Sequence, residues 1–268
     1  MRRVALVTGS GSGIGRAIAT TLARSSCDVV LNDLPPGAET IDGGLRTTKA
    51  ECEAVGARVL VCRGDVTDRK AVEEMCKRAV SEMGRLDIAV SNAYFAERAD
   101  FLDLTLEGFR RTLDVTLLGS FNVCQMAARE MSRQSTLDKI VLISSVMADY
   151  PYLIDTNAPY NAAKAALNNM SESMASSLSK HRINVNCVSP GWIDTQGERK
   201  FTPDWGVVDK KGRASIPRGI GRAEHIANAV KFICSDEANY VTGTNFKVDG
   251  GFGVSQRVPG LHNPIEVP

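Results

Sequence analysis

The chain begins with a short apolar stretch, a glycine-rich loop and an amphipathic stretch, in that order. Residues 4–7 are all apolar and predict a buried strand, whereas Ile14, Ile18 and Leu22 recur at helical spacing. Glycines let such a loop turn sharply and approach a diphosphate closely, and the first N–H groups of the following helix attract anions. We therefore predict a dinucleotide-binding loop, with a flexible turn of an ordinary α/β protein as the alternative. The loop residues of the predicted site are Gly9, Ser12, Gly13, Ile14 and Gly15.

Predicted strands and helices alternate along the rest of the chain, which favours a parallel sheet covered by helices on both faces. Further strands are expected at residues 28–33, 58–62, 86–90, 139–143, 183–188 and 245–248. Helices are expected at residues 43–55, 68–83, 105–132, 159–180 and 222–234. The predicted fold class is therefore α/β, a doubly wound parallel sheet of about seven strands, with ligands at the carboxyl ends of the strands.

The composition argues against several classes of protein. The chain has 32 basic and 31 acidic residues, so neither nucleic acid nor an anionic membrane is expected as a partner. No apolar run is long enough for a signal peptide or a membrane span, and we expect a soluble, cytoplasmic protein. The seven cysteines include no C-x-x-C pair and are expected to be reduced and mostly buried. The three histidines are far apart in the sequence, and no metal site is expected.

Two acidic residues follow predicted strands at positions suited to a nucleotide. We expect the Asp33 carboxylate to accept hydrogen bonds from the adenosine ribose hydroxyls and to repel a 2′-phosphate. Because the glycine loop also lacks a basic residue, the sequence favours NAD over NADP; a strand-end Asp that caps a turn is the alternative. Asp65 is expected to accept a hydrogen bond from the adenine amino group, to cap the helix that begins near Asp68, or to do both.

Tyr160 and Lys164 lie four residues apart in a predicted helix and therefore share one of its faces. Such a pair alone is usually part of a solvated helix face, but here a serine ends the preceding strand and a dinucleotide loop opens the chain. A free tyrosine has a pKa of about 10, so a pKa near 7 requires roughly 4 kcal/mol from nearby positive charge. Lys164 and an oxidised nicotinamide are candidate sources of this charge.

From residue 4 to about residue 253 the chain closely resembles the classical short-chain dehydrogenases/reductases, a family with a single-domain Rossmann fold. The matching segments, in the family's order and near its spacing, are Thr8-Gly9 through Gly15, Asp65-Val66, Asn92-Ala93, Ser145, Tyr160 to Lys164, Asn186, Pro190-Gly191, Thr195 and Val248 to Gly251. The resemblance implies one domain over residues 1–253, followed by a tail at 254–268. It points to the sugar and polyol branch of the family, similar to glucose 1-dehydrogenase, or to the branch of 3-oxoacyl reductases.

The resemblance also implies roles for individual residues. Tyr160 is expected to be the general acid/base, and Lys164 to bind the nicotinamide ribose and lower the pKa of Tyr160. Ser145, or Ser144 as the alternative, is expected to hydrogen-bond the substrate oxygen, and Thr195 to contact the nicotinamide carboxamide. Other residues implied in cofactor binding are Val66, Asn92, Ala93, Pro190, Gly191 and Ile193.

Two positions depart from the family pattern. Tyr94 stands near the cofactor where the family usually has a glycine. Thr116 stands where the family commonly has an Asn that completes a proton relay through water to the lysine. Thr is shorter than Asn, so the relay is expected to run through an added water or to be impaired.

Two segments are assigned to the substrate side of the site. Residues 196–216 correspond to the mobile lid of the family, and their basic side chains favour a polar or acidic substrate; a solvated loop is the alternative. Tyr150 and Tyr152 are expected to line the substrate cleft, with aromatic packing against a loop as the simpler alternative.

These features predict an NAD-dependent oxidoreductase that moves a hydride between nicotinamide C4 and a secondary alcohol or hemiacetal carbon, with a sugar or polyol favoured. The enzyme alternatives are a 3-oxoacyl-thioester reductase and a steroid or xenobiotic carbonyl reductase. A non-catalytic NAD(H)-binding regulator is the alternative from another class, motivated by Tyr94 and Thr116. The resemblance also implies a homotetramer, with subunit contacts at residues 222–234 and 245–248.

Overall fold

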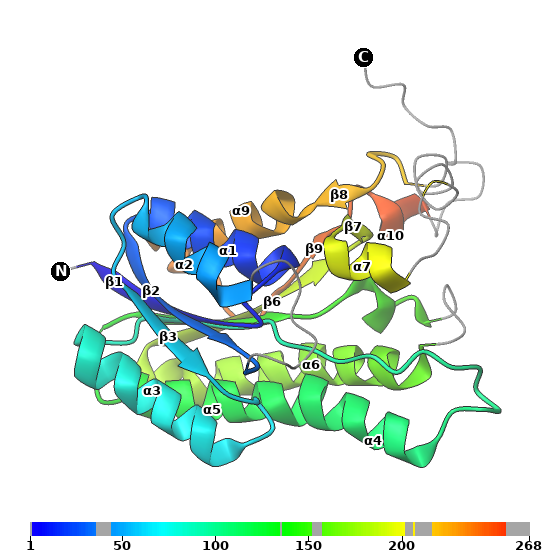
Figure 1. The fold of residues 1–268 in the computed structure, drawn as a ribbon, viewed down its shortest axis with the longest axis horizontal. Coiled ribbons are helices and arrows are strands. Elements are labelled where there is room, and N and C mark those ends of the chain that lie inside the picture. The colour runs from blue at the N-terminus through cyan, green and yellow to red at the C-terminus, as the bar shows by residue number, and fades with distance from the viewer. Residues whose placement is uncertain are drawn as a thin grey trace.

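In the part of the chain that the computed structural model describes, seven parallel strands form the main sheet (Figure 1). The described residues are 2–35, 44–134, 136–151, 157–201, 206 and 216–255. The strands are β1 (Arg3–Thr8), β2 (Cys27–Asp33), β3 (Val59–Arg63), β4 (Ile88–Ser91), β5 (Asp138–Ile143), β6 (Ile183–Pro190) and β9 (Asn245–Val248). Their order across the sheet is β3-β2-β1-β4-β5-β6-β9. The order reverses between β1 and β4, so the carboxyl ends of these two strands flank the crevice where such sheets bind ligands.

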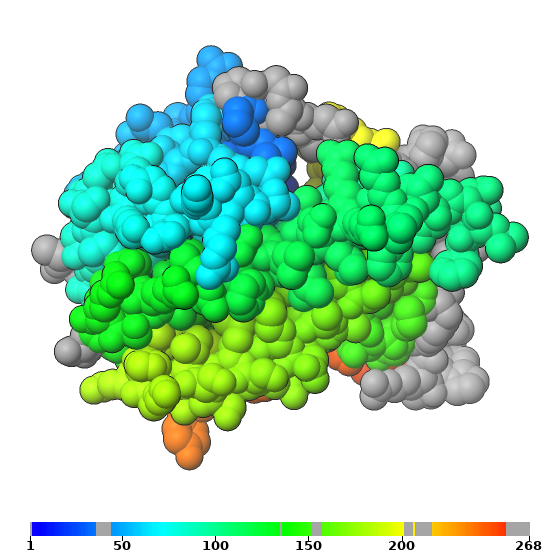
Figure 2. All heavy atoms as spheres, turned by 90° about the horizontal axis from the view of Figure 1, so that it is seen from below, coloured from blue at the N-terminus to red at the C-terminus, as the bar shows by residue number. Residues whose placement is uncertain are grey.

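Helices cover both faces of this sheet (Figure 1). One face carries α1 (Gly13–Arg24), α2 (Gly44–Glu53) and α9 (Ala223–Ile233). The other carries α3 (Arg69–Met83), α4 (Leu106–Leu113), α5 (Gly119–Met131) and α6 (Ala158–Leu178), and Figure 2 looks onto this helical layer.

The strands supply apolar side chains to both layers because successive residues point to opposite faces. In β1, Val4 and Leu6 belong to the core under α3, α5 and α6, while Ala5 and Val7 belong to the core under α1, α2 and α9. All four side chains are fully buried. This two-sided burial explains why β1 has an uninterrupted apolar sequence.

The predicted α/β class, the parallel sheet and its strands are confirmed. The expected helix at 105–132 consists of α4 and α5 joined by a π-helical turn over Asp114–Leu118. Helix α6 ends at Leu178 and continues as a 3-10 turn over Ser179–His181. The sequence did not predict the small parallel pair of β7 (Ile193–Asp194) and β8 (Gly221–Arg222), because a two-residue strand has no periodic pattern. The described chain also contains two short helices, α7 (Gln196–Phe201) and α10 (Phe252–Ser255), and two 3-10 turns, at Val146–Ala148 and Asp236–Ala238.

Several expectations fall on residues outside the described ones, namely Tyr152, residues 202–205 and 207–215 of the expected lid, and residues 256–268 of the tail. The cysteine prediction is confirmed, because all seven side chains are buried and none forms a disulfide. Among the described residues, no helix has both the length and the apolarity that a membrane crossing requires.

A group of polar side chains lies at the amino end of the sheet. Asp87 accepts a hydrogen bond from the Val4 backbone N–H at 2.8 Å and is paired with Arg85. Asp138 is fully buried beside it and accepts a hydrogen bond from the Thr136 hydroxyl at 2.8 Å. Burial raises the pKa of the Asp138 carboxyl to about 6, and the nearby Asp87 charge acts in the same direction. The cause is that burial removes the carboxyl group from water, which disfavours its charged form.

We predict that the free energy of unfolding depends on pH through the Asp138 carboxyl and that Asp138→Asn abolishes this dependence. A carboxyl with a higher pKa in the folded chain, about 6 against 3.8, favours folding while it is protonated. This contribution is fully present below about pH 4 and is lost as the pH rises through 6. The free energy of unfolding of the wild type relative to the variant should therefore fall by about 3 kcal/mol between pH values of about 4 and 7. Urea titrations at each pH measure this difference, and a difference that stays constant across the range would contradict the prediction.

Candidate active site

The glycine loop between β1 and α1 has a backbone that requires glycine at several positions. Gly9 and Gly13 have φ values of +61° and +51°, in the left-handed region that side chains disfavour. A Cβ added to Gly15 would collide with the carbonyl oxygen of Gly9. The loop is therefore a tight turn that exposes backbone groups with no Cβ in front of them.

The amino end of α1 fits a diphosphate. Its N-cap residue, Ser12, makes no side-chain capping hydrogen bond, and the first turn contains no acidic residue. The partial positive charge of the helix end is therefore not neutralised by its own side chains. A Cβ at Gly13 would lie 3.6 Å from the side chain of Thr195, which follows β7. The segment after β6 thus reaches the glycine loop and closes one side of the crevice.

Asp33, at the end of β2, lies directly against this loop. Its carboxylate accepts hydrogen bonds from the backbone N–H of Gly11 at 2.8 Å and of Leu34 at 2.9 Å. Arg16 donates a hydrogen bond to the Gly11 carbonyl at 2.6 Å, so a guanidinium also lies at the loop. The glycine loop itself contains no basic residue, but Arg16 folds back from the first turn of α1 and brings its positive charge to the loop.

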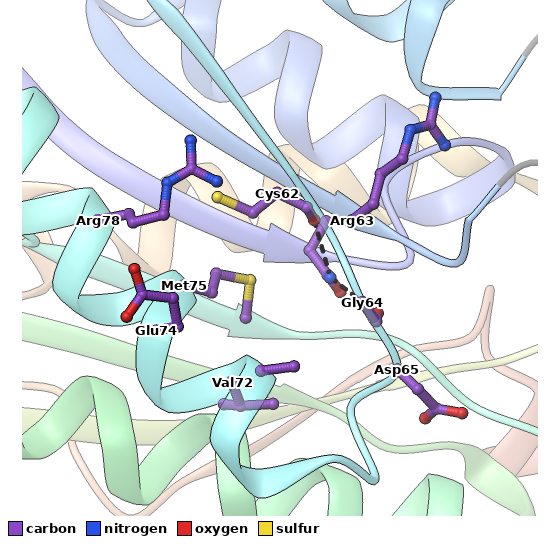
Figure 3. A pocket seen from close by; sticks show the side chains of 10 residues that line it. Cys62, Arg63, Gly64, Asp65, Val72, Glu74, Met75 and Arg78 are labelled. Atoms are coloured by element: carbon purple, nitrogen blue, oxygen red, sulfur yellow. Dashed lines mark hydrogen bonds between the residues drawn. The ribbon is translucent and has the colours of Figure 1, made fainter.

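Asp65 and Val66 occupy the turn between β3 and α3. Asp65 accepts a hydrogen bond from the Thr67 backbone N–H at 2.8 Å, whereas Asp68 caps α3 by accepting from Lys70 and Ala71. The alternative in which Asp65 caps the helix is therefore wrong, and its role in binding adenine stays a prediction. Figure 3 shows the neighbouring cavity of about 230 Å³ between the end of β3 and α3. Its lining includes Cys62, Arg63, Gly64, Asp65, Val72, Glu74, Met75 and Arg78.

Asn92 and Ala93 join the ends of β1 and β4. Both backbone N–H groups donate to the Thr8 hydroxyl, at 3.0 and 3.1 Å. The Asn92 amide donates to the carbonyl oxygens of Thr8 and Gly9, at 2.9 and 3.3 Å. These bonds fix the crevice where the strand order reverses.

Tyr160 and Lys164 lie on α6 beside the end of β5. The Lys164 ammonium is almost fully buried and donates a hydrogen bond to the Ile143 carbonyl at 2.7 Å. Its Nζ atom is 5.4 Å from the centroid of the Tyr160 ring. The Ser145 side chain lies near the Tyr160 phenol and lowers its pKa, and the Ser145 hydroxyl accepts a hydrogen bond from the Met147 N–H at 3.1 Å. The Ser144 hydroxyl instead donates to the backbone carbonyl of Lys164 at 3.0 Å. The structure therefore brings Ser145, Tyr160 and Lys164 together and directs Ser144 away from the phenol.

Known proteins share this fold and much of this sequence. A model of the family described as enoyl-(acyl carrier protein) reductase matches residues 9–253. An L-rhamnose 1-dehydrogenase (NAD(P)(+)) of Sphingomonas sp. (strain SKA58) is 35% identical over 258 residues, which cover 94% of this chain and 97% of that protein. The chain belongs to the short-chain dehydrogenase/reductase family.

Two further similarities agree with this assignment. The 3-oxoacyl-[acyl-carrier-protein] reductase FabG of Thermotoga maritima is 33% identical over 250 residues, 93% of this chain and 97% of that protein. The crystal structure of a short-chain type dehydrogenase/reductase from Mycobacterium marinum superposes with a TM-score of 0.85 at 31% identity, covering 93% of this chain and 95% of that one. The chain is thus an oxidoreductase of the short-chain alcohol dehydrogenase type, and dehydrogenases of this type use nicotinamide cofactors.

In this short-chain dehydrogenase, burial controls the protonation of the Tyr160 and Lys164 pair. Burial raises the pKa of Tyr160, with a smaller contribution from Tyr94, while the Ser145 side chain lowers it. Burial lowers the pKa of Lys164 to about 7. The protein's own groups therefore keep Tyr160 as a neutral phenol near neutral pH, and lowering its pKa requires additional positive charge.

The two residues that depart from the family pattern lie next to this pair. The Tyr94 ring is 50% exposed, and its centroid lies 5.8 Å from that of Tyr160 and 5.4 Å from the Lys164 Nζ atom. Thr116 is fully buried in the π-helical turn between α4 and α5. Its hydroxyl donates to the Phe95 carbonyl at 2.8 Å and accepts from the Phe95 N–H at 3.1 Å. The Thr116 hydroxyl is thus engaged with the loop after β4.

An ion pair that the sequence did not reveal links two segments beside the site. Arg98, in the loop after β4, donates to both carboxylate oxygens of Glu198 in α7, at 3.2 and 3.0 Å. Both charges act on the pKa of Tyr160, which the Glu198 carboxylate raises and the Arg98 guanidinium lowers. One hundred residues separate the partners in the chain, and no local pattern relates two residues so far apart.

Tyr150 is buried and packs against the helix α10. It is only 5% exposed, donates a hydrogen bond to the Gly253 carbonyl at 3.1 Å, and packs edge-on against Phe252. Tyr150 therefore holds α10 against the turn after β5, and the expectation that it lines the substrate cleft is wrong.

Proposed function

We propose that the protein is an NAD-dependent oxidoreductase that transfers a hydride between nicotinamide C4 and a secondary alcohol or carbonyl carbon. The observation that carries the proposal is that Ser145, Tyr160 and Lys164 meet at the carboxyl end of β5. When bound, the nicotinamide ring supplies the acceptor or donor of the hydride at C4. Tyr160 exchanges the proton of the substrate hydroxyl, and Ser145 holds the substrate oxygen by a hydrogen bond. Lys164 binds the nicotinamide ribose and, when protonated, favours the ionised phenol.

The cofactor site combines the glycine loop, the ends of β2, β3 and β4, and the segment after β6. The unneutralised amino end of α1 binds the diphosphate, and Asp33 binds the adenosine ribose. The cofactor-binding residues of the proposal are Gly9, Ser12, Gly13, Ile14, Gly15, Asp33, Asp65, Val66, Asn92, Ala93, Tyr160, Lys164, Pro190, Gly191, Ile193 and Thr195.

A sugar or polyol is the favoured substrate. The support comes from the name of the L-rhamnose 1-dehydrogenase relative and from the charged Arg98 and Glu198 side chains, which act on the pKa of Tyr160. A 3-oxoacyl-thioester reductase is the second candidate. It is favoured by the family description, enoyl-(acyl carrier protein) reductase, and by the similarity to FabG.

We predict that Tyr160→Phe removes turnover but keeps cofactor binding. Loss of a general acid/base lowers the rate by about 10²- to 10⁴-fold, whereas the remaining ring preserves the shape of the site. The assay follows NADH formation from NAD with a panel of aldoses, polyols and secondary alcohols, and NAD(P)H oxidation with 3-oxoacyl thioesters. Fluorescence titration with NADH is the control for binding. Turnover that survives in the variant would contradict the role of Tyr160, and wild-type protein that binds NADH without turning over any substrate would favour the regulator.

We predict that the wild type prefers NAD and that Asp33→Ser shifts the preference toward NADP. The Asp33 charge repels a 2′-phosphate, while Arg16 and Arg63 lie beside the loop and the end of β2 and attract it once Asp33 is neutral. Removal of a repulsion of about 1.4 kcal/mol corresponds to a tenfold gain in NADP affinity, which calorimetric titration of both cofactors measures. The control is Asp68→Ser, which alters a helix cap near the nucleotide end of the crevice. Equal or tighter binding of NADP by the wild type would overturn the assignment.

We also propose that the protein is a homotetramer. Two surfaces with exposed apolar side chains support this. Phe232 and Tyr240 are exposed around the end of α9. Leu118 and Phe121 are exposed in a groove of about 980 Å³ over α4 and α5, which charged side chains also line. A closed tetramer with dihedral symmetry requires at least two different interfaces of this kind.

Light scattering should therefore give four times the chain mass for the wild type. Phe121→Glu replaces an exposed apolar side chain of one of the two surfaces by a charge and should halve this mass, because the other surface remains intact. A monomeric wild type would rule out the tetramer.

A further inference from the structure

Tyr94 and Thr116 are connected through the loop after β4. The Thr116 hydroxyl makes both hydrogen bonds of the Phe95 backbone, and the Ala93 N–H is bound by the Thr8 hydroxyl. The residues on either side of Tyr94 are therefore both tied to buried groups. Arg111 also packs over the Phe95 ring, 4.2 Å from its centroid. This anchoring places the Tyr94 ring in a defined position.

The Lys164 ammonium makes few hydrogen bonds and contacts the ring of Tyr94. An ammonium has three N–H donors, and the described part of the chain provides one hydrogen-bond acceptor for them, the Ile143 carbonyl. The Lys164 Nζ atom lies over two aromatic rings, 5.4 Å from the centroid of the Tyr94 ring and 5.4 Å from that of the Tyr160 ring. The electron-rich face of a ring attracts a cation within about 6 Å, most strongly where water is excluded. Lys164 is 2% exposed and meets this condition.

We propose that Tyr94 is a positioning residue whose ring face keeps the Lys164 ammonium charged and in place beside Tyr160, and that Thr116 acts by holding the Tyr94 loop. The inference deepens the proposed function, on which its catalytic meaning rests. It gives one common role to the two residues that depart from the family pattern. A charged Lys164 is what favours the ionised form of the Tyr160 phenol.

The other ionisable or polar groups around the pair come from several elements. Cys187 of β6 lies near Lys164, but burial raises the pKa of its thiol to about 11, so it is neutral near pH 7. Ser145 reaches Tyr160 from the end of β5. Arg98 and Glu198 act on Tyr160 with opposite signs and neutralise each other as an ion pair. None of these groups replaces the aromatic contact on the ammonium.

The direct test measures the pKa of Lys164 by NMR, following the ¹³Cε signal of labelled lysines with pH in the full-length protein and assigning it with Lys164→Arg. Tyr94→Phe keeps the ring and should leave this pKa within the error of the wild type. Tyr94→Leu keeps a smaller apolar side chain without the ring face and should lower the pKa of Lys164 by about 0.5 to 1 unit. Phe101→Leu, an exposed aromatic of the same loop, is the matched control and should have no effect.

Two further variants test the proposed role of Thr116. Thr116→Val removes both hydrogen bonds to Phe95 and should lower the pKa of Lys164 in the same direction as Tyr94→Leu, whereas Thr116→Ser should restore it. In the double variant, Thr116→Val should add nothing to Tyr94→Leu, because both act through one contact. Additive shifts would overturn the link between the two residues.

The measurement does not require turnover, so it decides the inference even if the proposed reaction fails. An unchanged Lys164 pKa in Tyr94→Leu would overturn it, as would an equal loss in Tyr94→Phe, which would assign the effect to the hydroxyl. With an active wild type, the acidic limb of kcat/KM for alcohol oxidation should move to higher pH in Tyr94→Leu. A change in KM alone would mean that the ring only lines the cleft.

Discussion

The hydrogen bonds between Thr8 and Asn92 join the carboxyl ends of the two central strands, and both walls of the site begin there. The glycine loop continues from β1, and the loop that carries Tyr94 continues from β4. The Thr8 hydroxyl accepts two backbone N–H groups at once, and all of these groups are largely buried. A buried polar group that loses its partner costs the full desolvation free energy, so the parts of this cluster depend on one another. The spacing between the cofactor loop and the catalytic side is thereby set by one small network.

A buried ammonium is the second constraint on the site. Removing Lys164 from water disfavours its charged form, and the fold counters this with a carbonyl from the end of β5 and with two aromatic faces. The same strand end carries Ser145, two residues after Ile143. The Ser144 hydroxyl, bonded to the Lys164 carbonyl, fixes α6 against this strand. One strand end and one helix face therefore determine how the serine, the phenol and the ammonium lie relative to one another.

The fold was predictable because its signals are local. The apolar run of β1, the glycines of the loop and the helical spacing of Ile18 and Leu22 each report on neighbouring residues, and each was correct. The α4–α5 segment was predicted as one helix, because a π-helical turn changes the hydrogen-bond pattern without a marked change in sequence pattern. The pair Tyr160 and Lys164 was visible for the same local reason, since four residues make one helical turn.

Other features of the site depend on distant contacts and had no sequence signal. Arg98 meets Glu198 only after the sheet and the loops are in place. Arg16 follows the glycine loop in the sequence, and only the folded backbone brings its side chain back to Gly11. The sequence predicts Asp65 as one candidate cap of the helix that begins near Asp68, whereas the structure identifies Asp68 itself as the cap. Backbone geometry determines which of several neighbouring polar residues caps a helix or contacts a loop. Composition and spacing do not reveal this geometry.

Tyr94 and Thr116 both depart from the family pattern, and the two departures are understood better together than one at a time. Tyr94 adds a ring where the pattern has a glycine, and Thr116 removes the amide that the pattern expects. Together they form one chain of contacts from the π-helical turn through Phe95 to Lys164. A threonine suits its place because a single hydroxyl oxygen donates to the Phe95 carbonyl and accepts from the Phe95 N–H, whereas an amide divides these functions between two atoms. A glycine at position 94 would offer no ring to the Lys164 ammonium. In the proposed arrangement the tyrosine supplies the ring and the threonine holds the loop that carries it, so each residue depends on the other.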